Sequence, residues 1–233
     1  MYQQIKILED EDKALCLLPT TDYSFSATYN QVPLAYYELF KASASYPIMF
    51  LKKEDKSYTA VAFLSLETGT NLYVTSTKSY EPGIYKPTYF TRFPFIYANL
   101  NNTLTFAYDT KSTLLNEKSG EALFDVKGEP TELLNKKIEE LNRYQLGIQE
   151  ISDIIKALDD AGVLVTATEP LSFGENYLNL NGFMYIDEVK LNNLPEKTLL
   201  SLTNKGAYKA AIAQLISLNN FESLVLKQNK QGN

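Results

Sequence analysis

Histidine is absent from this 233-residue sequence, and its absence removes several kinds of active site at once. Serine and cysteine nucleophiles usually depend on an imidazole base, so the Ser-His-Asp and Cys-His arrangements are excluded. The histidine facial triad and histidine-based zinc sites are excluded for the same reason. Any catalysis would need carboxylates, lysine, tyrosine or a bound cofactor.

Cysteine and long apolar runs are also scarce. Cys16 is the only cysteine, so the chain has no internal disulfide, which is typical of a reducing cytoplasm. No stretch of about 18 consecutive apolar residues occurs, and the first residues carry charges where a secretory signal has its apolar region. We therefore expect a cytoplasmic protein that does not insert into a membrane.

Positive charge is in short supply as well. The sequence has 28 acidic and 22 basic residues, which gives a net charge of −6, and Arg92 and Arg143 are its only arginines. Proteins that bind nucleic acid neutralise phosphates with a basic face. We therefore expect no nucleic-acid partner.

Motifs that hold phosphates, metals or nucleophiles are missing from the sequence. It contains no glycine-rich phosphate loop, G-x-S-x-G elbow, S-x-x-K dyad, C-x-x-C pair or D-x-D-x-D-G calcium loop. We identify no catalytic residue from motifs, and we expect neither a metal nor a cofactor.

The residues that are present predict an α+β fold in one domain over residues 1–233. Hydrophobic residues make up 45% of the chain, and no linker or shift in composition divides it. Strand patterns at 48–51 and 57–67, on either side of a charged turn, predict a β-hairpin, and 103–108 predicts another strand. We expect a largely antiparallel sheet covered by helices.

Helical spacing is clearest between residues 131 and 161. Pro130 opens this segment and Gly162 closes it, with apolar residues recurring every three or four positions between them. About 30 residues at roughly 1.5 Å each form a rod about 45 Å long. Such a helix either lies across the whole sheet or extends to meet a partner.

Shorter patterns predict the remaining elements. Residues 33–45 have the spacing of a helix, while 70–75 and 178–185 have the character of strands. A C-terminal helical segment follows Pro195, with a left-handed cap at Gly206 and a break at Asn219-Asn220.

Aromatic residues are dense between residues 80 and 98, with Arg92 in their midst. One interpretation is irregular core packing, in which tyrosine hydroxyls reach polar partners. The other is a pocket for an anionic group, or a peptide-binding surface, around the arginine. On the second interpretation the candidate binding residues are Arg92, Tyr89, Tyr85 and Phe93.

Four further residues are candidates for binding. Tyr46 begins the segment Tyr46-Pro47-Ile48, whose pattern returns in Phe93-Pro94-Phe95. Glu38 lies one helical turn from Lys41 in the expected helix, where the two would pair weakly at the surface. Asp187 and Glu188 end the expected strand, where they either cap a helix or turn or belong to a site.

Spaced blocks along the chain resemble the SapC family, which is named for a protein linked to surface-layer transport. The blocks are Val32-Pro33-Leu34 with Glu38, Tyr46-Pro47-Ile48-Met49-Phe50, Tyr89 with Arg92-Phe93-Pro94-Phe95, Gly120, Leu123-Phe124-Asp125, Gly128-Glu129-Pro130, Gly182-Phe183-Met184-Tyr185-Ile186-Asp187-Glu188, Lys190-Leu191, Leu194-Pro195, Leu199, Leu202, Gly206, and Gln214-Leu215-Ile216-Ser217-Leu218-Asn219. Relatives tend to carry paired basic residues where this chain has Thr91-Arg92. The resemblance carries over no catalytic residue.

The resemblance implies a cytoplasmic accessory protein that engages a surface-layer protein, or a component of its type I secretion system, before export. Two alternatives remain open. One is an enzyme that modifies a peptide or protein, with Arg92, Tyr89, Glu38 and Asp187 converging in a pocket. The other is a structural domain that forms homo-oligomers through the long helix, which charges at Ile148 and Ile151 would disrupt.

Overall fold

The computed structural model describes residues 1–173 and 176–231, and its mixture of helices with antiparallel sheets confirms the α+β class. The strands are β1 (Ile5–Ile7), β2 (Cys16–Leu17), β3 (Gln31–Leu34), β4 (Ile48–Lys52), β5 (Tyr58–Phe63), β6 (Phe95–Leu100), β7 (Thr103–Asp109), β8 (Leu115–Asn116), β9 (Glu121–Ala122), β10 (Leu164–Thr166), β11 (Leu171–Phe173), β12 (Asn176–Leu178) and β13 (Met184–Ile186). The helices are α1 (Leu39–Ser43), α2 (Thr88–Thr91), α3 (Glu132–Asp160), α4 (Glu188–Asn192), α5 (Glu196–Asn204), α6 (Ala207–Ser217) and α7 (Asn220–Gln231), with short 3-10 turns η1 (Asp10–Asp12), η2 (Ser24–Ser26) and η3 (Tyr36–Glu38). Within the described residues, no helix is both long and apolar enough to cross a membrane.

The largest sheet formed by the described residues, called the central sheet below, has the strand order β10-β13-β4-β5-β3. All its neighbouring strands are antiparallel. The expected hairpin lies at its middle, where β4 and β5 pair from Ile48↔Ala62 to Lys52↔Tyr58. Every residue of β5 is buried.

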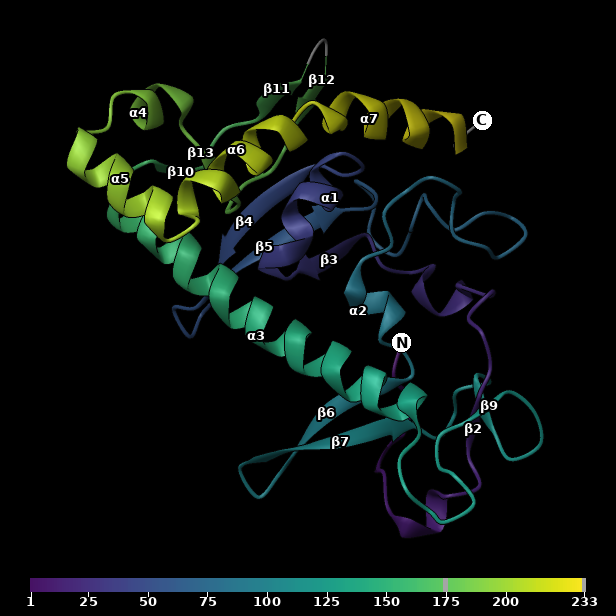
Figure 1. The fold of residues 1–233 in the computed structure, drawn as a ribbon. Coiled ribbons are helices and arrows are strands. Elements are labelled where there is room, and N and C mark those ends of the chain that lie inside the picture. Colours follow the sequence, from purple (N-terminus) through teal and green to yellow (C-terminus); the bar gives the residue numbers. More distant parts are fainter. Residues whose placement is uncertain (174–175, 232–233) are drawn as a thin grey trace.

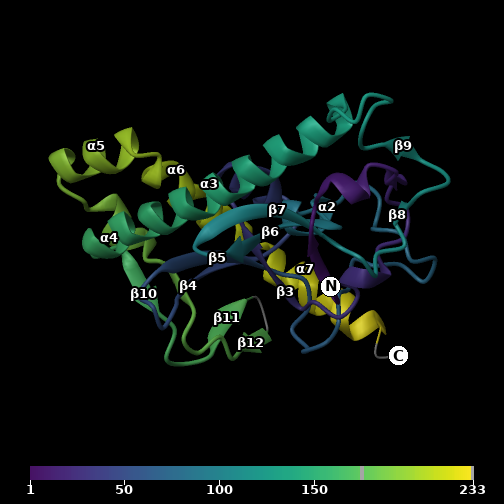
Figure 2. The ribbon, with the colours of Figure 1, turned by 90° about the horizontal axis from the view of Figure 1, so that it is seen from below.

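The two faces of β5 show how the helices cover the sheet. The Tyr58 hydroxyl donates to Asp159 of α3, and the ring of Phe63 lies 5.5 Å from the ring of Phe221 in α7. Residues 58 and 63 point to opposite faces because side chains alternate along a strand. Figures 1 and 2 accordingly show α3 and α7 on opposite sides of β4 and β5.

The long helix α3 confirms the expected helix over 131–161. Its N-cap is Thr131, whose side chain accepts a hydrogen bond from the Leu134 N–H at 3.4 Å, and Gly162 follows its end with a φ of +73°. Figure 1 shows α3 crossing the whole molecule, from the central sheet at one end to β6 and β7 at the other. The helix thus lies across the fold instead of projecting from it.

A second sheet, in the order β1-β7-β6, lies beside the first half of α3. Its β6–β7 hairpin turns at Asn101 and Asn102, which both have a positive φ (51° and 64°) as a tight hairpin turn requires. β7 confirms the strand expected over 103–108, whereas β6 begins inside the aromatic segment 80–98, where no strand was expected.

Three expected elements are wrong in part. Residues 33 and 34 belong to strand β3, so the helix expected over 33–45 shrinks to η3 and α1. Pro33 fits a strand here because β3 is at the edge of the central sheet. Residues 70–75 make turns and one isolated bridge, Val74↔Tyr80. The strand expected over 178–185 is divided into β12 and β13 by a turn at Gly182, whose φ is +85°.

The C-terminal helices were predicted well, and α6 also completes the central sheet. Gly206 has a φ of +75° before α6, and α6 ends at Ser217 before α7 begins at Asn220. The Gln214 amide accepts from the Ile186 N–H at 3.1 Å and donates to the Ile48 carbonyl at 3.1 Å. Gln214 therefore bridges β13 and β4 where these strands stop pairing directly.

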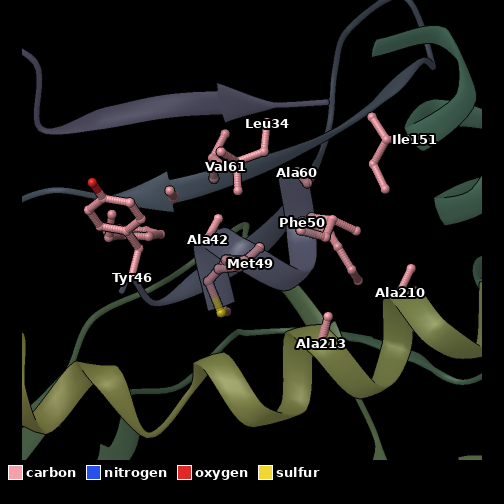
Figure 3. Packing of buried hydrophobic residues seen from close by; sticks show 14 of the residues in the cluster. Leu34, Ala42, Tyr46, Met49, Phe50, Ala60, Val61, Ile151, Ala210 and Ala213 are labelled. Atoms are coloured by element: carbon pink, nitrogen blue, oxygen red, sulfur yellow. The ribbon is translucent and has the colours of Figure 1, made fainter. Parts of the chain in front are cut away.

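Two clusters of buried apolar side chains hold the fold together. The main core lies between the central sheet, the second half of α3, α1, α6 and α7. Figure 3 shows part of it, with Phe50, Ile151, Ala210 and Ala213 facing one another. The small core consists of Phe95, Tyr108, Leu123, Leu134 and Leu141. The single helix α3 contributes side chains to both cores.

Candidate binding site around Glu38 and Arg92

Glu38 is a buried carboxylate at the junction of η3 and α1. It has no exposed surface, and it accepts hydrogen bonds from the Ala35 N–H (2.9 Å), the Thr88 N–H (2.7 Å) and the Tyr85 hydroxyl (2.9 Å). Burial raises the pKa of Glu38 above its ordinary value, although these donors oppose the shift. The expected surface pair with Lys41 is wrong, because Glu38 faces α2 and the segment before it.

Tyr85 and Tyr46 extend this hydrogen-bonded network into the main core. The Tyr46 hydroxyl contacts the Tyr85 carbonyl and the Tyr80 hydroxyl, the latter at 2.8 Å. Burial raises the pKa of Tyr46 and of Tyr85, so both phenols keep their protons near neutral pH. Three of the candidate residues therefore form one connected network with Glu38 as its charged end.

Arg92 lies at the end of α2 among tyrosine rings. Its guanidinium carbon is 4.8 Å from the ring centre of Tyr89, 4.7 Å from that of Tyr144 and 5.9 Å from that of Tyr2. These distances are those of cation–π contacts. Tyr89 in turn packs edge-on against Tyr29, with ring centres 5.8 Å apart.

Phe93 follows Arg92 in sequence but lines a separate cleft. Its ring stacks on Phe25 with centres 4.4 Å apart, and it precedes a cis peptide bond to Pro94. The two rings line a cleft of about 350 Å³, together with polar side chains that include Asp22 and Lys111. Phe93 is thus a neighbour of the Arg92 cluster but lines its own pocket.

Asp187 and Glu188 lie away from the other candidates. They begin α4, which follows β13 near one edge of the central sheet. Helix α2 packs against β3, which forms the opposite edge of that sheet. The Asp187 side chain caps α4 by accepting from the Lys190 N–H at 3.0 Å. The four residues expected to converge in an enzyme pocket therefore do not all meet, because Asp187 is remote from Glu38, Tyr89 and Arg92.

Several residues at this site were missed in the sequence. Tyr144 comes from α3, Tyr2 precedes β1, and Tyr37 donates from its hydroxyl to Thr88 Oγ1 at 3.2 Å. The helical spacing of Leu141 and Tyr144 was a signal for a buried Tyr144. No local pattern indicated Tyr2, because its contacts depend on the tertiary fold.

The second arginine also stacks on a tyrosine at this junction. The guanidinium carbon of Arg143 is 4.1 Å from the ring centre of Tyr37. Both line a cleft of about 280 Å³ between α3 and Thr88, with Lys136, Glu139 and Glu140 around it. Both arginines of the chain thus lie along the contact between α3 and the η3–α2 region.

The chemistry of the site is that of binding through tyrosine, arginine and a buried carboxylate. Among the described residues, no group of three or more cysteine, aspartate or glutamate side chains is placed to hold a metal ion. A guanidinium with free N–H groups recognises carboxylates and phosphates, which it binds through two parallel hydrogen bonds.

Comparison with known proteins places the chain in a family. No curated protein and no solved structure gives a significant match. The family model described as SapC matches residues 9–224, which include both cores and nearly all of the site. The chain therefore belongs to the SapC family.

Proposed function

We propose that the chain is a cytoplasmic accessory protein, which binds a surface-layer protein or a component of its type I secretion system before export. The observation that carries this proposal is the family match over residues 9–224. The family is named for a link to surface-layer transport, and an accessory protein in that process acts by binding.

The surface of the molecule is consistent with a protein partner. Large apolar side chains are exposed on successive helices, with exposed fractions of 72% for Leu146 on α3, 70% for Val189 on α4 and 59% for Leu200 on α5. Interfaces between proteins bury such side chains at their centre and leave polar residues at the rim.

Co-purification from the native host tests this function. The tagged chain is purified, the bound proteins are identified by mass spectrometry, and purified surface-layer protein is then tested for direct binding. We expect the surface-layer protein or a secretion component to be retained and to bind in the purified system. If neither binds in either experiment, the proposal is wrong. Cell fractionation checks the cytoplasmic location separately.

Formation of homo-oligomers through α3 is a second candidate role, favoured by the exposure of Leu146. Charges at Ile151 are unsuitable as a test, because Ile151 is fully buried in the main core. Leu146→Glu changes an exposed position instead, so the monomer should keep its fold. If α3 mediates self-association, this variant has a lower mass in solution than the unmodified chain. Equal masses for the two proteins would exclude a Leu146 interface.

A further inference from the structure

Arg92 carries a positive charge that nothing in the described residues neutralises. Its side chain makes neither a hydrogen bond nor an ion pair there, and its Nε atom is buried without a partner. Arginine keeps its proton in proteins, so the charge remains at every relevant pH. Buried polar groups nearly always have partners, and an exception needs an explanation.

The surrounding tyrosine rings do not supply the missing acceptors. The rings of Tyr89 and Tyr144 attract the charge through their π electrons, but neither side chain makes a hydrogen bond with Arg92. The guanidinium is therefore held in position while its hydrogen-bond donors remain unused.

Nearby carboxylates are already committed to other donors. Glu38 accepts from two backbone N–H groups and Tyr85. Glu140 binds Lys137 Nζ at 2.8 Å and Thr91 Oγ1 at 3.1 Å. Asp109 accepts from the N–H groups of Gln3 and Gln4, both at 2.9 Å. None of these three carboxylates makes a hydrogen bond or an ion pair with Arg92 in the described part of the chain.

The unused donors are accessible from outside. Within the described residues, Nε of Arg92 is the only buried side-chain nitrogen or oxygen without a partner, so the Nη atoms of Arg92 reach solvent. Tyr144 is 4% exposed, and its hydroxyl makes no hydrogen bond in the described part of the chain although it is not completely enclosed. Burial raises the pKa of Tyr144, so this hydroxyl remains a donor.

We propose that Arg92 and the Tyr144 hydroxyl form a binding site for a carboxylate, with Tyr89 and Tyr2 holding the guanidinium in place. A carboxylate matches the fork of N–H groups with two oxygens. It also carries one negative charge, whereas phosphate carries up to two and meets stronger repulsion from a chain of net charge −6. The site stands on this geometry alone, so it does not depend on the proposed role in export.

The presence of only two arginines makes a direct test possible. In a ¹H–¹⁵N spectrum of the Nε–H groups, Arg92 and Arg143 give the only two arginine signals. An Arg143→Lys variant assigns them, and Arg143 then serves as an internal control because this residue is exposed, so water solvates its N–H groups. Sodium acetate replaces sodium chloride during the titration at constant ionic strength.

We expect the Arg92 signal to shift along a saturating curve, while the Arg143 signal moves little and without saturation. Arg92→Lys keeps the positive charge but loses the paired N–H groups of the guanidinium. It should weaken acetate binding about tenfold. The effect of acetate on the thermal midpoint of unfolding measures this change. If the Arg92 signal does not move, or moves only as Arg143 does, the site does not exist. This result needs no variant of Arg92 to fold.

Further titrations define the ligand. Saturation with inorganic phosphate but not with acetate would overturn the assignment to a carboxylate. A blocked peptide, acetyl-Gly-Glu-Gly-amide, separates the two sources of carboxylate. Tighter binding of the peptide than of acetate supports a glutamate of a protein partner, and equal or weaker binding supports a free small carboxylate. Failure of the co-purification experiment would leave this titration unaffected.

Discussion

The main core and the small core use the same helix but are enclosed to different degrees. In the main core, β4 and β5 are covered on both faces, and residues such as Phe50 and Ile155 have no exposed surface. The five residues of the small core are also buried, but the β6–β7 hairpin extends past its cover, so Leu100 and Leu104 beside this core are each about half exposed (50% and 52%). The second half of α3 therefore packs against a sheet that is covered on both faces, while its first half packs against a hairpin that is only partly covered.

Each region also holds a buried carboxylate, and the two are stabilised differently. Glu38, beside the main core, is bound by backbone N–H groups and a phenol. Asp12, beside the small core, accepts from Lys6 Nζ at 2.6 Å, the Tyr108 hydroxyl at 2.7 Å and the Glu9 N–H at 3.0 Å. Burial favours a raised pKa at both residues. At Glu38 burial prevails and the pKa is raised, whereas at Asp12 the Lys6 ammonium and the other donors outweigh burial and the pKa is lowered.

The largest expected effect compares the two cores directly. Phe50→Ala should lower the free energy of unfolding by about 4 kcal/mol, because the enclosed main core cannot collapse around the missing ring. Leu123→Ala should cost about 2 kcal/mol, at the low end for its type, because the open layer of the small core relaxes more easily. Urea unfolding measures both, with Leu104→Ala as a surface control that should change little. A larger cost for Leu123→Ala than for Phe50→Ala would show that the small core is the tighter one.

Glu38→Gln should reveal the pH dependence of the buried carboxylate beside the main core. A raised pKa in the folded state means that the stabilising contribution of Glu38 is complete below its ordinary pKa of 4.5 and is lost as pH rises through the folded value. Each unit of difference is worth about 1.4 kcal/mol. The stability of the variant relative to the unmodified chain should therefore improve between pH 4 and pH 8. Urea unfolding across this range measures the trend, and a flat difference would contradict it.

Asp12→Asn should show the opposite trend in the small core. The lowered pKa of Asp12 means that its contribution is complete above its ordinary pKa of 3.8 and disappears as pH falls through the folded value. The variant should therefore be most destabilised near pH 7 and approach the unmodified chain near pH 3. If the two variants instead show the same dependence of their relative stability on pH, the two carboxylates are not stabilised differently.

The elements predicted correctly are those whose signals are local. The β4–β5 hairpin, α3 with its end before Gly162, and the turn at Gly206 each follow from residues adjacent in sequence. Residues 33 and 34 of β3 were predicted as helix because Leu34 and Tyr37 have helical spacing. The pairing of β3 with β5, at Pro33↔Val61, overrides that local preference. Strand pairing of this kind depends on residues far away in the chain.

The residues of the candidate site also divide into those recognised from the local sequence and those brought together only by the tertiary fold. Arg92 and Tyr89 were recognised together because both belong to one aromatic segment. Two of the three hydrogen-bond partners of Glu38 lie 47 and 50 residues away, at Tyr85 and Thr88, so the sequence indicated a surface pair with Lys41 and not a buried carboxylate. Tyr144 is 52 residues from Arg92, on another element. Residue types therefore indicated the chemistry of the site, and only the fold shows which side chains meet.

Gly147 provides the smallest and most local comparison, since it lies on α3 between the two cores. A Cβ at this position would be 2.8 Å from the Ala35 Cβ and 3.1 Å from the Tyr37 ring. Replacing glycine by alanine within a helix normally stabilises it by about 1 kcal/mol, while overpacking costs about 1–3 kcal/mol. We expect Gly147→Ala to destabilise the fold by about 1 kcal/mol, because the segment that leads into Glu38 must move away from α3.

Thermal and urea unfolding of Gly147→Ala measure this balance, with Gln145→Ala as a control at an exposed position of the same helix. The control should be close to neutral, because its side chain does not lie between packed elements. If Gly147→Ala is instead more stable than the unmodified chain, the Ala35–Tyr37 segment yields without cost. In that case the contact at Gly147 does not fix η3 against α3. The position of Glu38 would then depend on its hydrogen bonds to α2 and Tyr85 alone, and Glu38→Gln should have the larger effect on the thermal midpoint.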